Sequence, residues 1–260
     1  MITSFLQGGL GNQMFQIAAA HALALENKDT AAFDVTNHHL PWQGRSPMNY
    51  ANNIFKEVNF IQTPVSYTGV YMEPKHSYVP IEYSDNLMLH GFFQSEKYFK
   101  HREEEVRKLF TPPEKVYAEI RWKYNLILSG DPISIHVRRG DYVQLKDTHP
   151  LCDIQYYKDS LEKMGEYQSI MVFSDDIYWC KNNLDIPNAY VFHIAEEEDW
   201  VDLYLMSRCR RNIIANSSFS WWAAWMNNNP NKRVICPRNW FGDKGPQDTQ
   251  DLIPEGWIQL

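Results

Sequence analysis

The stretch ISIHVRRGDY, residues 133–142, decides how this chain folds and how it is interpreted. Its β-branched run predicts a buried strand over Ile133–Val137. Two adjacent arginines, Arg138 and Arg139, follow directly. A guanidinium group presents a fixed fork of N–H donors that matches phosphate oxygens two at a time. The stretch therefore predicts an oxyanion site at the end of a strand, although two surface arginines bridged to a neighbouring carboxylate would fit the same pattern.

The chain around and after this stretch alternates short apolar runs with helical patterns. We predict strands over 133–137, 170–173, 190–194, 212–215 and 233–236, and helices over 156–164, 177–183, 199–208 and 219–227. Apolar strands separated by helices indicate a parallel sheet with helices on both faces. Such sheets bind ligands beyond the carboxyl ends of their strands. The arginines at 138 and 139 fall at such an end.

The first half of the chain is less regular. It predicts strands over 1–6, 31–35 and 87–93, a glycine loop over 8–11, and helices over 12–27 and 94–110. Prolines and polar clusters leave 36–83 without an assignment, and a helix over 116–128 would connect the two halves. We therefore expect two α/β domains, 1–125 and 126–260.

Composition narrows the class of protein. The 260 residues carry a net charge of −7, which argues against nucleic acid as the main partner. Positive charge is concentrated at Arg138-Arg139 and at Arg208, Arg210 and Arg211, where a phosphate ligand would have to be met. Four cysteines without CxxC spacing indicate buried thiols and no zinc or redox motif. The chain starts without a secretory signal and has no apolar run of membrane-spanning length, so we expect a cytoplasmic protein.

Two further motifs follow predicted strands and have both ligand-binding and structural interpretations. GGLGNQMFQ, residues 8–16, joins a strand to a helix whose free N–H groups would attract an anion, but glycine turns of this kind are common. It is not a GxGxxG dinucleotide fingerprint. FSDD, residues 173–176, places carboxylates where a base edge or a ribose hydroxyl could be bound. Alternatively, Ser174 or Asp175 caps the next helix.

The motif NIIANSSFSWWAAW, residues 212–225, leads from a strand into a helix. Hydroxyl groups and free N–H groups at a helix start form a neutral phosphate cradle, to which the helix dipole adds. We favour ligand contact for Ser217 and Ser218. For Trp221, Trp222 and Trp225 we favour a place in the core.

In order and spacing, these motifs resemble glycosyltransferase family 11, the inverting α-1,2-fucosyltransferases of bacteria and animals. The resemblance runs through GGLGNQMFQ, GFFQSEKYF (91–99), HVRRGDY, FSDD with Trp179, and LMSRCRRNIIANSSFSWWAAW (205–225). One departure is Arg210-Arg211, where members often carry CxHNI. The membrane anchor and stem of the animal members are missing, so the chain looks like a bacterial cytoplasmic form.

The resemblance implies a GT-B-like fold, with two Rossmann-like halves facing a cleft and a C-terminal parallel doubly wound sheet. Residues 1–125 would form the acceptor side and 126–260 the GDP-sugar-binding domain. It implies transfer of L-fucose from GDP-β-L-fucose to the 2-hydroxyl of a terminal galactoside, with no metal or other cofactor. The alternatives are a transferase for another GDP-linked deoxyhexose and a non-catalytic carbohydrate-binding protein.

The resemblance also implies roles for individual residues. Arg138 would bind the β-phosphate, His136 would help to hold the nucleotide, and Asn12 would lie near the reaction centre. Asp175 or Asp176 would bind the guanine edge, while Ser217 and Ser218 would contact the pyrophosphate. The complete predicted site comprises catalytic Arg138, Asn12 and Asp141; donor-binding Gly9, Gly11, His136, Arg138, Arg139, Ser174, Asp175, Asp176, Asn216, Ser217 and Ser218; and no metal ligand.

The general base and the acceptor stay open at this point. Asp34, Glu96 and Asp141 are carboxylates in or near motifs, and Asp141 could equally brace Arg139 through a salt bridge. A dissociative mechanism would need no strong base. The acceptor would be a galactose-terminated oligosaccharide or a lipid-linked glycan, shaped by residues 37–83. A lipid-linked acceptor would bring the protein to the inner face of the plasma membrane as a peripheral protein.

Overall fold

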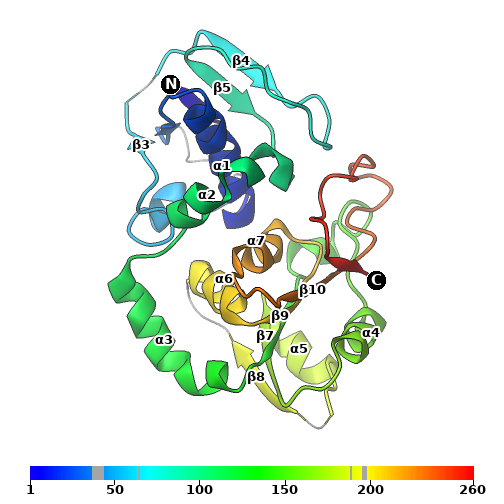
Figure 1. The fold of residues 1–260 in the computed structure, drawn as a ribbon. Helices are drawn as coiled ribbons and strands as arrows, with labels where there is room; N and C mark the ends of the chain where they lie inside the picture. Colours follow the sequence, from blue (N-terminus) through cyan, green and yellow to red (C-terminus); the bar gives the residue numbers. More distant parts are fainter. Residues whose placement is uncertain (37–43, 64, 188, 195–197) are drawn as a thin grey trace. The chain divides into compact units, whose positions relative to one another are not determined.

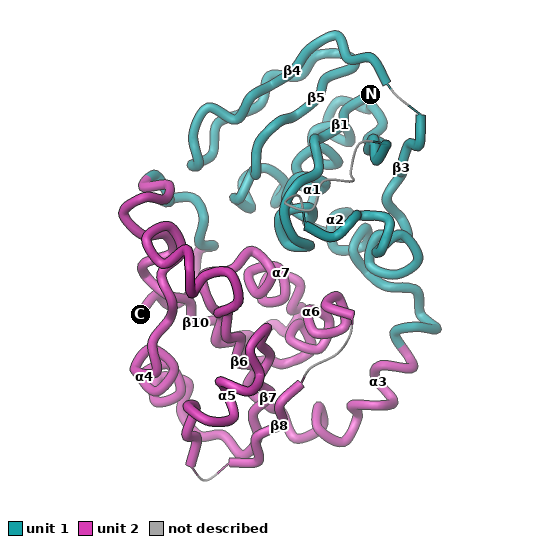
Figure 2. The backbone as a smooth tube through the Cα atoms, turned by 180° about the vertical axis from the view of Figure 1, so that it is seen from behind, with its two compact units in different colours: residues 1–117, 248–254 teal, residues 118–247, 255–260 magenta. Residues whose placement is uncertain are grey.

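The computed structural model describes residues 1–36, 44–63, 65–187, 189–194 and 198–260, and it divides into two compact units. Unit 1 comprises residues 1–117 and 248–254, and unit 2 comprises residues 118–247 and 255–260 (Figure 2). The division differs from the expected boundary at 125/126. It falls inside helix α3 (Glu114–Ser129), and a segment near the C-terminus joins the first unit.

Unit 2 is built on a six-stranded sheet in which all neighbouring strands are parallel, with the order β11-β10-β9-β6-β7-β8. The strands are β6 (Ile133–Val137), β7 (Ser169–Ser174), β8 (Tyr190–Ile194), β9 (Arg211–Ile213), β10 (Arg233–Cys236) and β11 (Ile258–Gln259). The chain runs outward from β6 through β7 and β8, then returns to the other side of β6 with β9. Doubly wound sheets bind ligands beyond the strand ends at this reversal, here between β6 and β9. The predicted parallel sheet is confirmed.

Four helices alternate with these strands: α4 (Ile154–Met164), α5 (Ile177–Asn183), α6 (Asp199–Arg208) and α7 (Ser218–Met226). In Figure 1, α6 and α7 lie together on one face of the sheet, and α4 and α5 lie on the other. On α4, Tyr157, Leu161 and Met164 recur at helical spacing and are buried in one core cluster with residues of β6, β7 and β9. Strands β6, β8 and β10 and helices α5 and α6 have the predicted bounds; β7, β9, α4 and α7 agree to within two residues.

Helix α7 carries a tryptophan cluster. Trp221 and Trp222 have no exposed surface, and 3% of Trp225 is exposed. The ring centroids of Trp221 and Trp222 lie 5.3 Å apart, and those of Trp222 and Trp225 lie 5.2 Å apart, both pairs edge to face. The prediction that these tryptophans belong to the core is confirmed.

Unit 1 contains a three-stranded parallel sheet with the order β1-β5-β4 and a separate parallel pair, β2 with β3. Its strands are β1 (Ile2–Ser4), β2 (Phe33–Asp34), β3 (Phe60–Ile61), β4 (Gly69–Met72) and β5 (Leu87–His90), and helix α1 (Leu10–Glu26) packs on β1. The predicted strands over 1–6, 31–35 and 87–93 are present but shorter. The unassigned stretch 36–83 contains β3, β4 and the 3-10 helix η2 (Pro47–Tyr50); its residues 37–43 and 64 lie outside the described part.

The predicted helix over 94–110 is wrong as a single helix. Two 3-10 turns, η3 (Glu96–Tyr98) and η4 (Lys100–Arg102), precede α2 (Glu103–Leu109). Between the turns, Phe99 has φ −143° and ψ −3°, outside helical geometry. The Ser95 hydroxyl accepts a hydrogen bond from the Lys97 N–H (3.3 Å), which favours a cap and a short turn over a continuous helix.

The segment 248–254 is fastened to unit 1 through two aspartates. The Ser77 hydroxyl donates to Asp248 (2.5 Å), the Tyr78 N–H donates to the carboxylate of Asp251 (3.0 Å), and the Ser95 hydroxyl donates to the Asp251 carbonyl (2.7 Å). The chain therefore leaves unit 1 in α3 and returns to it near the C-terminus. Within the described residues, no helix combines the length and apolar character needed to cross a membrane.

Candidate active site

The site lies at the carboxyl edge of the sheet in unit 2, where β9, β6 and β7 are neighbours. Val137 pairs with Ser174, and Ile135 pairs with Ile213, so the three strands end side by side. The segments that follow them carry the arginines, the aspartates and the serines predicted to bind the donor. The strand order thus brings together the predicted residues of the C-terminal half.

Arg138 follows β6 and is held by two carboxylates. Its Nη2 lies 2.7 Å from Asp141 and its Nη1 lies 3.0 Å from Asp175, while the guanidinium carbon lies 5.2 Å from the centre of the Tyr142 ring. Its Nε is buried and has no hydrogen-bond partner among the described residues. A buried donor without a partner costs about 1–3 kcal/mol, which a bound anion would recover. Asp141 thus pairs with Arg138 here, and not with Arg139 as considered from the sequence.

Arg139 has a different environment. Its Nε lies 3.2 Å from Asp176, and its guanidinium carbon lies 4.0 Å from the centre of the Trp179 ring, a cation–π contact. Asp176 also accepts from the Trp179 N–H (3.1 Å) as the N-cap of α5. The cap is therefore Asp176 and not Ser174 or Asp175; the Ser174 hydroxyl accepts from the Asp176 N–H (2.9 Å).

Asp175 joins the loops after β6 and β7. One carboxylate oxygen accepts from the Arg139 N–H (2.9 Å), and the other pairs with Arg138. A Cβ atom at Gly140 would lie 2.5 Å from this second oxygen, so only glycine permits the approach. In this structure Asp175 and Asp176 form ion pairs with Arg138 and Arg139. Their binding of a guanine edge stays a prediction.

His136 lies at the end of β6 with only 4% of its surface exposed. Its Nδ1 lies 2.8 Å from the Ser220 hydroxyl of α7, and its backbone carbonyl accepts from the Tyr157 hydroxyl (3.2 Å). Burial, together with the nearby charge of Arg138, lowers the pKa of His136 to about 3. The imidazole is therefore neutral near pH 7 and can both donate and accept a hydrogen bond.

This buried imidazole gives a prediction for stability. The unfolded chain takes up a proton at His136 as pH falls through 6.5, whereas the folded chain stays neutral down to about 3. Folding is therefore destabilised as pH falls through this window, by about 2 kcal/mol between pH 7 and pH 5 from this one group. Urea unfolding of the wild type and His136→Asn at both pH values measures the difference. His101→Asn, a change at an exposed histidine, is measured alongside; a pH dependence in His136→Asn equal to that of the wild type would contradict the prediction.

The loop after β9 carries Asn216, Ser217 and Ser218. Both amide hydrogens of Asn216 are engaged, because Nδ2 donates to the carbonyls of Pro150 and Trp240 (both 2.9 Å). The amide therefore fixes the loop, and donor binding by Asn216 stays a prediction. Ser217, the N-cap of helix α7, makes no side-chain cap hydrogen bond, so the first N–H groups of the helix suit an external acceptor.

In unit 1, the predicted glycine loop lies between β1 and α1. Gly8 has φ +78°, and a side chain at Gly44 would clash with the backbone of Gly8. Gly9 is the N-cap of α1, and Gly11 is buried in its first turn. Gln13 donates from Nε2 to the Gly8 carbonyl (2.9 Å). The buried polar side chain of this motif thus holds the loop, and phosphate contact by Gly9 and Gly11 stays a prediction.

Asn12 accepts a hydrogen bond from Gln94 (2.8 Å), which follows β5. The turn before Gln94 is fixed by Glu73, a residue that the sequence analysis missed. The carboxylate of Glu73 accepts from the N–H groups of Phe92 (2.7 Å) and Phe93 (3.0 Å), while burial raises its pKa. The motif GFFQ includes this turn, but Glu73, which fixes the turn, directly follows a different strand, β4.

None of the three carboxylates considered as a general base is singled out by its surroundings. Asp34 accepts from the N–H and hydroxyl of Thr36 (2.8 and 2.5 Å) at the end of β2. Glu96 pairs with Lys100 (2.7 Å), and Asp141 pairs with Arg138. Each has a local partner that accounts for its position.

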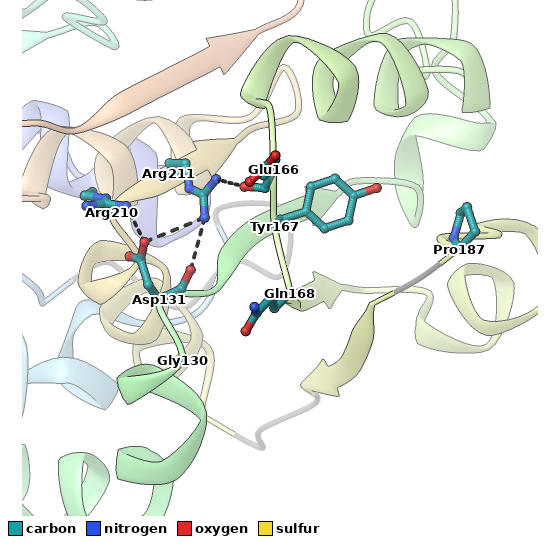
Figure 3. Close-up of a pocket in the computed structure, with 8 residues that line it drawn as sticks. All are labelled: Gly130, Asp131, Glu166, Tyr167, Gln168, Pro187, Arg210 and Arg211. Atoms are coloured by element: carbon teal, nitrogen blue, oxygen red, sulfur yellow. Dashed lines mark hydrogen bonds and ion pairs between the residues drawn. The ribbon is translucent and has the colours of Figure 1, made fainter.

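The second group of arginines lies at the opposite edge of the sheet. Arg211 begins β9, and Arg210 precedes it, where both pair with Asp131, the residue two positions before β6 (Figure 3). They line a shallow pocket of about 680 Å³ with Glu166, whose carbonyl accepts from Arg211 (2.6 Å). Arg208 ends the helix that leads to the same edge. This group therefore lies at the other edge of the sheet from Arg138, and its contact with a phosphate ligand stays a prediction.

Comparison with known proteins points to one family. The model of Glycosyl transferase family 11 matches residues 1–260. The chain is 32% identical to the Alpha-1,2-colitosyltransferase of Escherichia coli, covering 100% of this chain and 99% of the relative. It is 30% identical to the O-antigen biosynthesis glycosyltransferase WbnK of Escherichia coli, with 99% of each covered. Galactoside alpha-(1,2)-fucosyltransferase 1 of Alouatta belzebul is 26% identical over 86% of this chain and 64% of the relative.

Solved structures share the fold. The fucosyltransferase NodZ from Bradyrhizobium superposes with a TM-score of 0.57 at 14% identity, covering 86% of this chain and 91% of that chain. POFUT1 in complex with GDP-fucose superposes with a TM-score of 0.54 at 11% identity, covering 90% and 96%. The expected α/β, GT-B-like fold is thereby confirmed.

Proposed function

Since this chain belongs to glycosyltransferase family 11, we propose that it moves L-fucose from GDP-β-L-fucose to the 2-hydroxyl of a terminal galactoside, with inversion and without a metal ion. The observation that carries this proposal is Arg138. Arg138 lies beyond the end of β6, at the point where the strand order reverses. Its Nε is buried and has no partner among the described residues. Such a donor suits the diphosphate of a nucleotide sugar.

The chemistry explains why an arginine is needed there. Transfer breaks the bond between the anomeric carbon and a phosphate oxygen, so negative charge grows on the departing GDP while the sugar becomes oxocarbenium-like. Donors that are aimed at this charge beforehand supply a large part of catalysis. Arg138 is fixed by Asp175 and supplies both the charge and the fork geometry, which a lysine lacks.

The first N–H groups of α7 would complete the diphosphate site. Helix α7 starts at Ser218 and follows β9 along the chain, and β9 is the neighbour of β6. A helix N-terminus carries a partial positive charge and unpaired N–H groups. The neutral His136 beneath the site adds hydrogen-bonding capacity without another charge.

The diphosphate of the donor must compete with the carboxylates that pair with the arginines. Arg138 and Arg139 face Asp141, Asp175 and Asp176, so the group as a whole is negative before GDP binds. Asp141 is the most exposed of the three, with 56% of its side chain accessible, against 27% for Asp175. We infer that Asp141 leaves Arg138 when the diphosphate arrives and that Asp175 stays.

Asp141→Asn separates two roles for this residue. If Asp141 competes with the diphosphate for Arg138, the variant binds GDP a few-fold more tightly, because a neutral amide is a weaker competitor. Titration calorimetry with GDP measures this, and turnover of GDP-fucose is measured in parallel. Asp159→Asn, an exposed change on α4, is the control. Unchanged GDP affinity with turnover lowered by 100-fold or more would instead identify Asp141 as the base.

The donor sugar has a second candidate. The 32% identity to an Alpha-1,2-colitosyltransferase over the whole chain favours a GDP-linked colitose as the alternative donor. Turnover with GDP-fucose, GDP-colitose and GDP-mannose on a galactoside acceptor, followed by NMR assignment of the new linkage, decides between them. Adding EDTA should leave the rate unchanged; its loss and recovery with a divalent ion would contradict metal independence.

The acceptor would be a galactose-terminated oligosaccharide or a lipid-linked glycan, as the O-antigen relative suggests. With a lipid-linked acceptor the protein would work at the inner face of the plasma membrane. Turnover measured with a panel of soluble and lipid-linked galactosides tests which acceptor the protein uses.

The non-catalytic alternative is a carbohydrate-binding protein. GDP should raise the melting temperature of this protein, and a galactoside alone should raise it less. Stabilisation by sugars alone, together with absence of turnover for every donor, would overturn the proposed function.

A further inference from the structure

We propose that Tyr142 is a positioning residue, which holds the guanidinium of Arg138 against its ring and ties the arginine loop to the serine loop across the reversal point of the sheet. This inference rests on the proposed function, because it concerns how the same diphosphate site is assembled. Tyr142 has no role in the predicted site, although it closes the motif HVRRGDY.

The first contact is with the arginine. The guanidinium carbon of Arg138 lies 5.2 Å from the centre of the Tyr142 ring, within the range of a cation–π interaction. The two carboxylates pair with the two terminal nitrogens of the guanidinium, and the Tyr142 ring forms a third contact. A cation held by three groups has little freedom to rotate.

The Tyr142 ring is itself held in place by two further aromatic residues. The Tyr142 and His149 rings stack with centroids 4.5 Å apart and an interplanar angle of 14°, and Phe241 packs against His149 at 5.5 Å. Tyr142 lies in the short 3-10 helix η5 (Asp141–Val143), directly after the arginines. The stack therefore gives a short, exposed turn a rigid support.

The second contact joins the segment after β6 to the segment after β9. The Tyr142 hydroxyl donates to the backbone carbonyl of Asn216 (3.1 Å), the residue directly before Ser217 and Ser218. Tyr142 comes from the segment after β6, and Asn216 from the segment after β9, so the bond spans the two strands between which the chain order reverses. Burial raises the pKa of Tyr142 to about 12, so the hydroxyl keeps its proton and donates at every working pH.

Because of these contacts, we expect a change at Tyr142 to alter how tightly the β-phosphate of GDP is bound. GDP and GMP differ only in that phosphate, so the ratio of their affinities reports how well Arg138 and the serine loop are placed. A general weakening of the fold would lower both affinities together. A positioning defect lowers the GDP affinity and leaves the GMP affinity in place.

The experiment compares GDP and GMP binding by titration calorimetry in the wild type, Tyr142→Phe and Tyr142→Leu. Tyr142→Phe keeps the ring and loses the bond to Asn216, and we expect the GDP-to-GMP affinity ratio to fall about 5-fold. Tyr142→Leu loses the ring as well, and we expect a fall of about 10- to 100-fold, with GMP affinity within two-fold of the wild type. Turnover with GDP-fucose should fall in the same order. The control is Tyr190→Leu, an exposed tyrosine at the start of β8.

The outcomes separate the two claims. A wild type that binds GDP no better than GMP overturns the proposed function and this inference with it. A wild type that prefers GDP, with the same preference in Tyr142→Leu, overturns only the role of Tyr142, as does an equal loss of both affinities. If Tyr142→Leu does not fold, Tyr142→Phe decides: an unchanged ratio overturns the link to the serine loop.

Discussion

Replacing Arg138 with lysine is expected to lower kcat/KM for GDP-fucose by about 100- to 1000-fold, the usual cost of removing one donor that stabilises a developing anion. Lysine keeps the charge, but its donors all lie on one nitrogen and cannot reproduce the planar fork that pairs with Asp175 while presenting separate donors to the diphosphate. The fold should be retained, because a third of this side chain is exposed. Steady-state kinetics and circular dichroism measure the two effects.

Arg210→Lys is the matched control. Arg210 also pairs with an aspartate, Asp131, but at the amino edge of the same sheet. Its substitution should leave turnover within about two-fold of the wild type, since exposed ion pairs contribute little. Near-wild-type turnover in Arg138→Lys, or an equal loss in both variants, would remove Arg138 from the centre of the mechanism.

The largest effect on stability is expected from Trp222→Ala, a loss of about 3–5 kcal/mol in the free energy of unfolding. Trp222 has no exposed surface and contacts the rings of Trp221 and Trp225. Removing it leaves a cavity under α7, the helix whose first residues form the proposed cradle. GDP affinity should therefore fall together with stability.

Trp122→Ala controls for the loss of an indole as such. Trp122 lies on α3 with 85% of its surface exposed, so its removal should change the free energy of unfolding by less than about 0.5 kcal/mol. Urea unfolding followed by circular dichroism measures both variants independently of tryptophan fluorescence. Equal stability of the two variants would mean that the α7 cluster is not part of the core.

The sequence predicts the central strands of the unit 2 sheet well because they are buried on both faces. All five residues of β6 are buried, and β7 is buried up to its last residue. Such strands are continuous apolar runs whose bounds are set by the polar residues at their ends. The strand order also follows from topology, so the adjacency of the segments after β6, β7 and β9 could be expected.

Local patterns do not show partners from distant segments. The turn after β5 is shaped by Glu73 on another strand, and Phe93 takes φ +52°, which no local pattern indicates. The stop signal Thr111-Pro112-Pro113 predicts a helix over 94–110, but Ser95 and Phe99 break it. The arginines at 210 and 211 directly precede the predicted strand over 212–215, which places them at the amino edge of the sheet, where the structure has them.

The return of residues 248–254 to unit 1 bears on how the protein is made. Asp248 and Asp251 supply bonds to Ser77, Tyr78 and Ser95, and Leu252 is buried with 2% of its surface exposed. During synthesis, the first unit therefore cannot finish its packing until residues 248–254 have left the ribosome. Cutting the gene at codon 125 would separate this segment from its partners and leave both fragments incomplete.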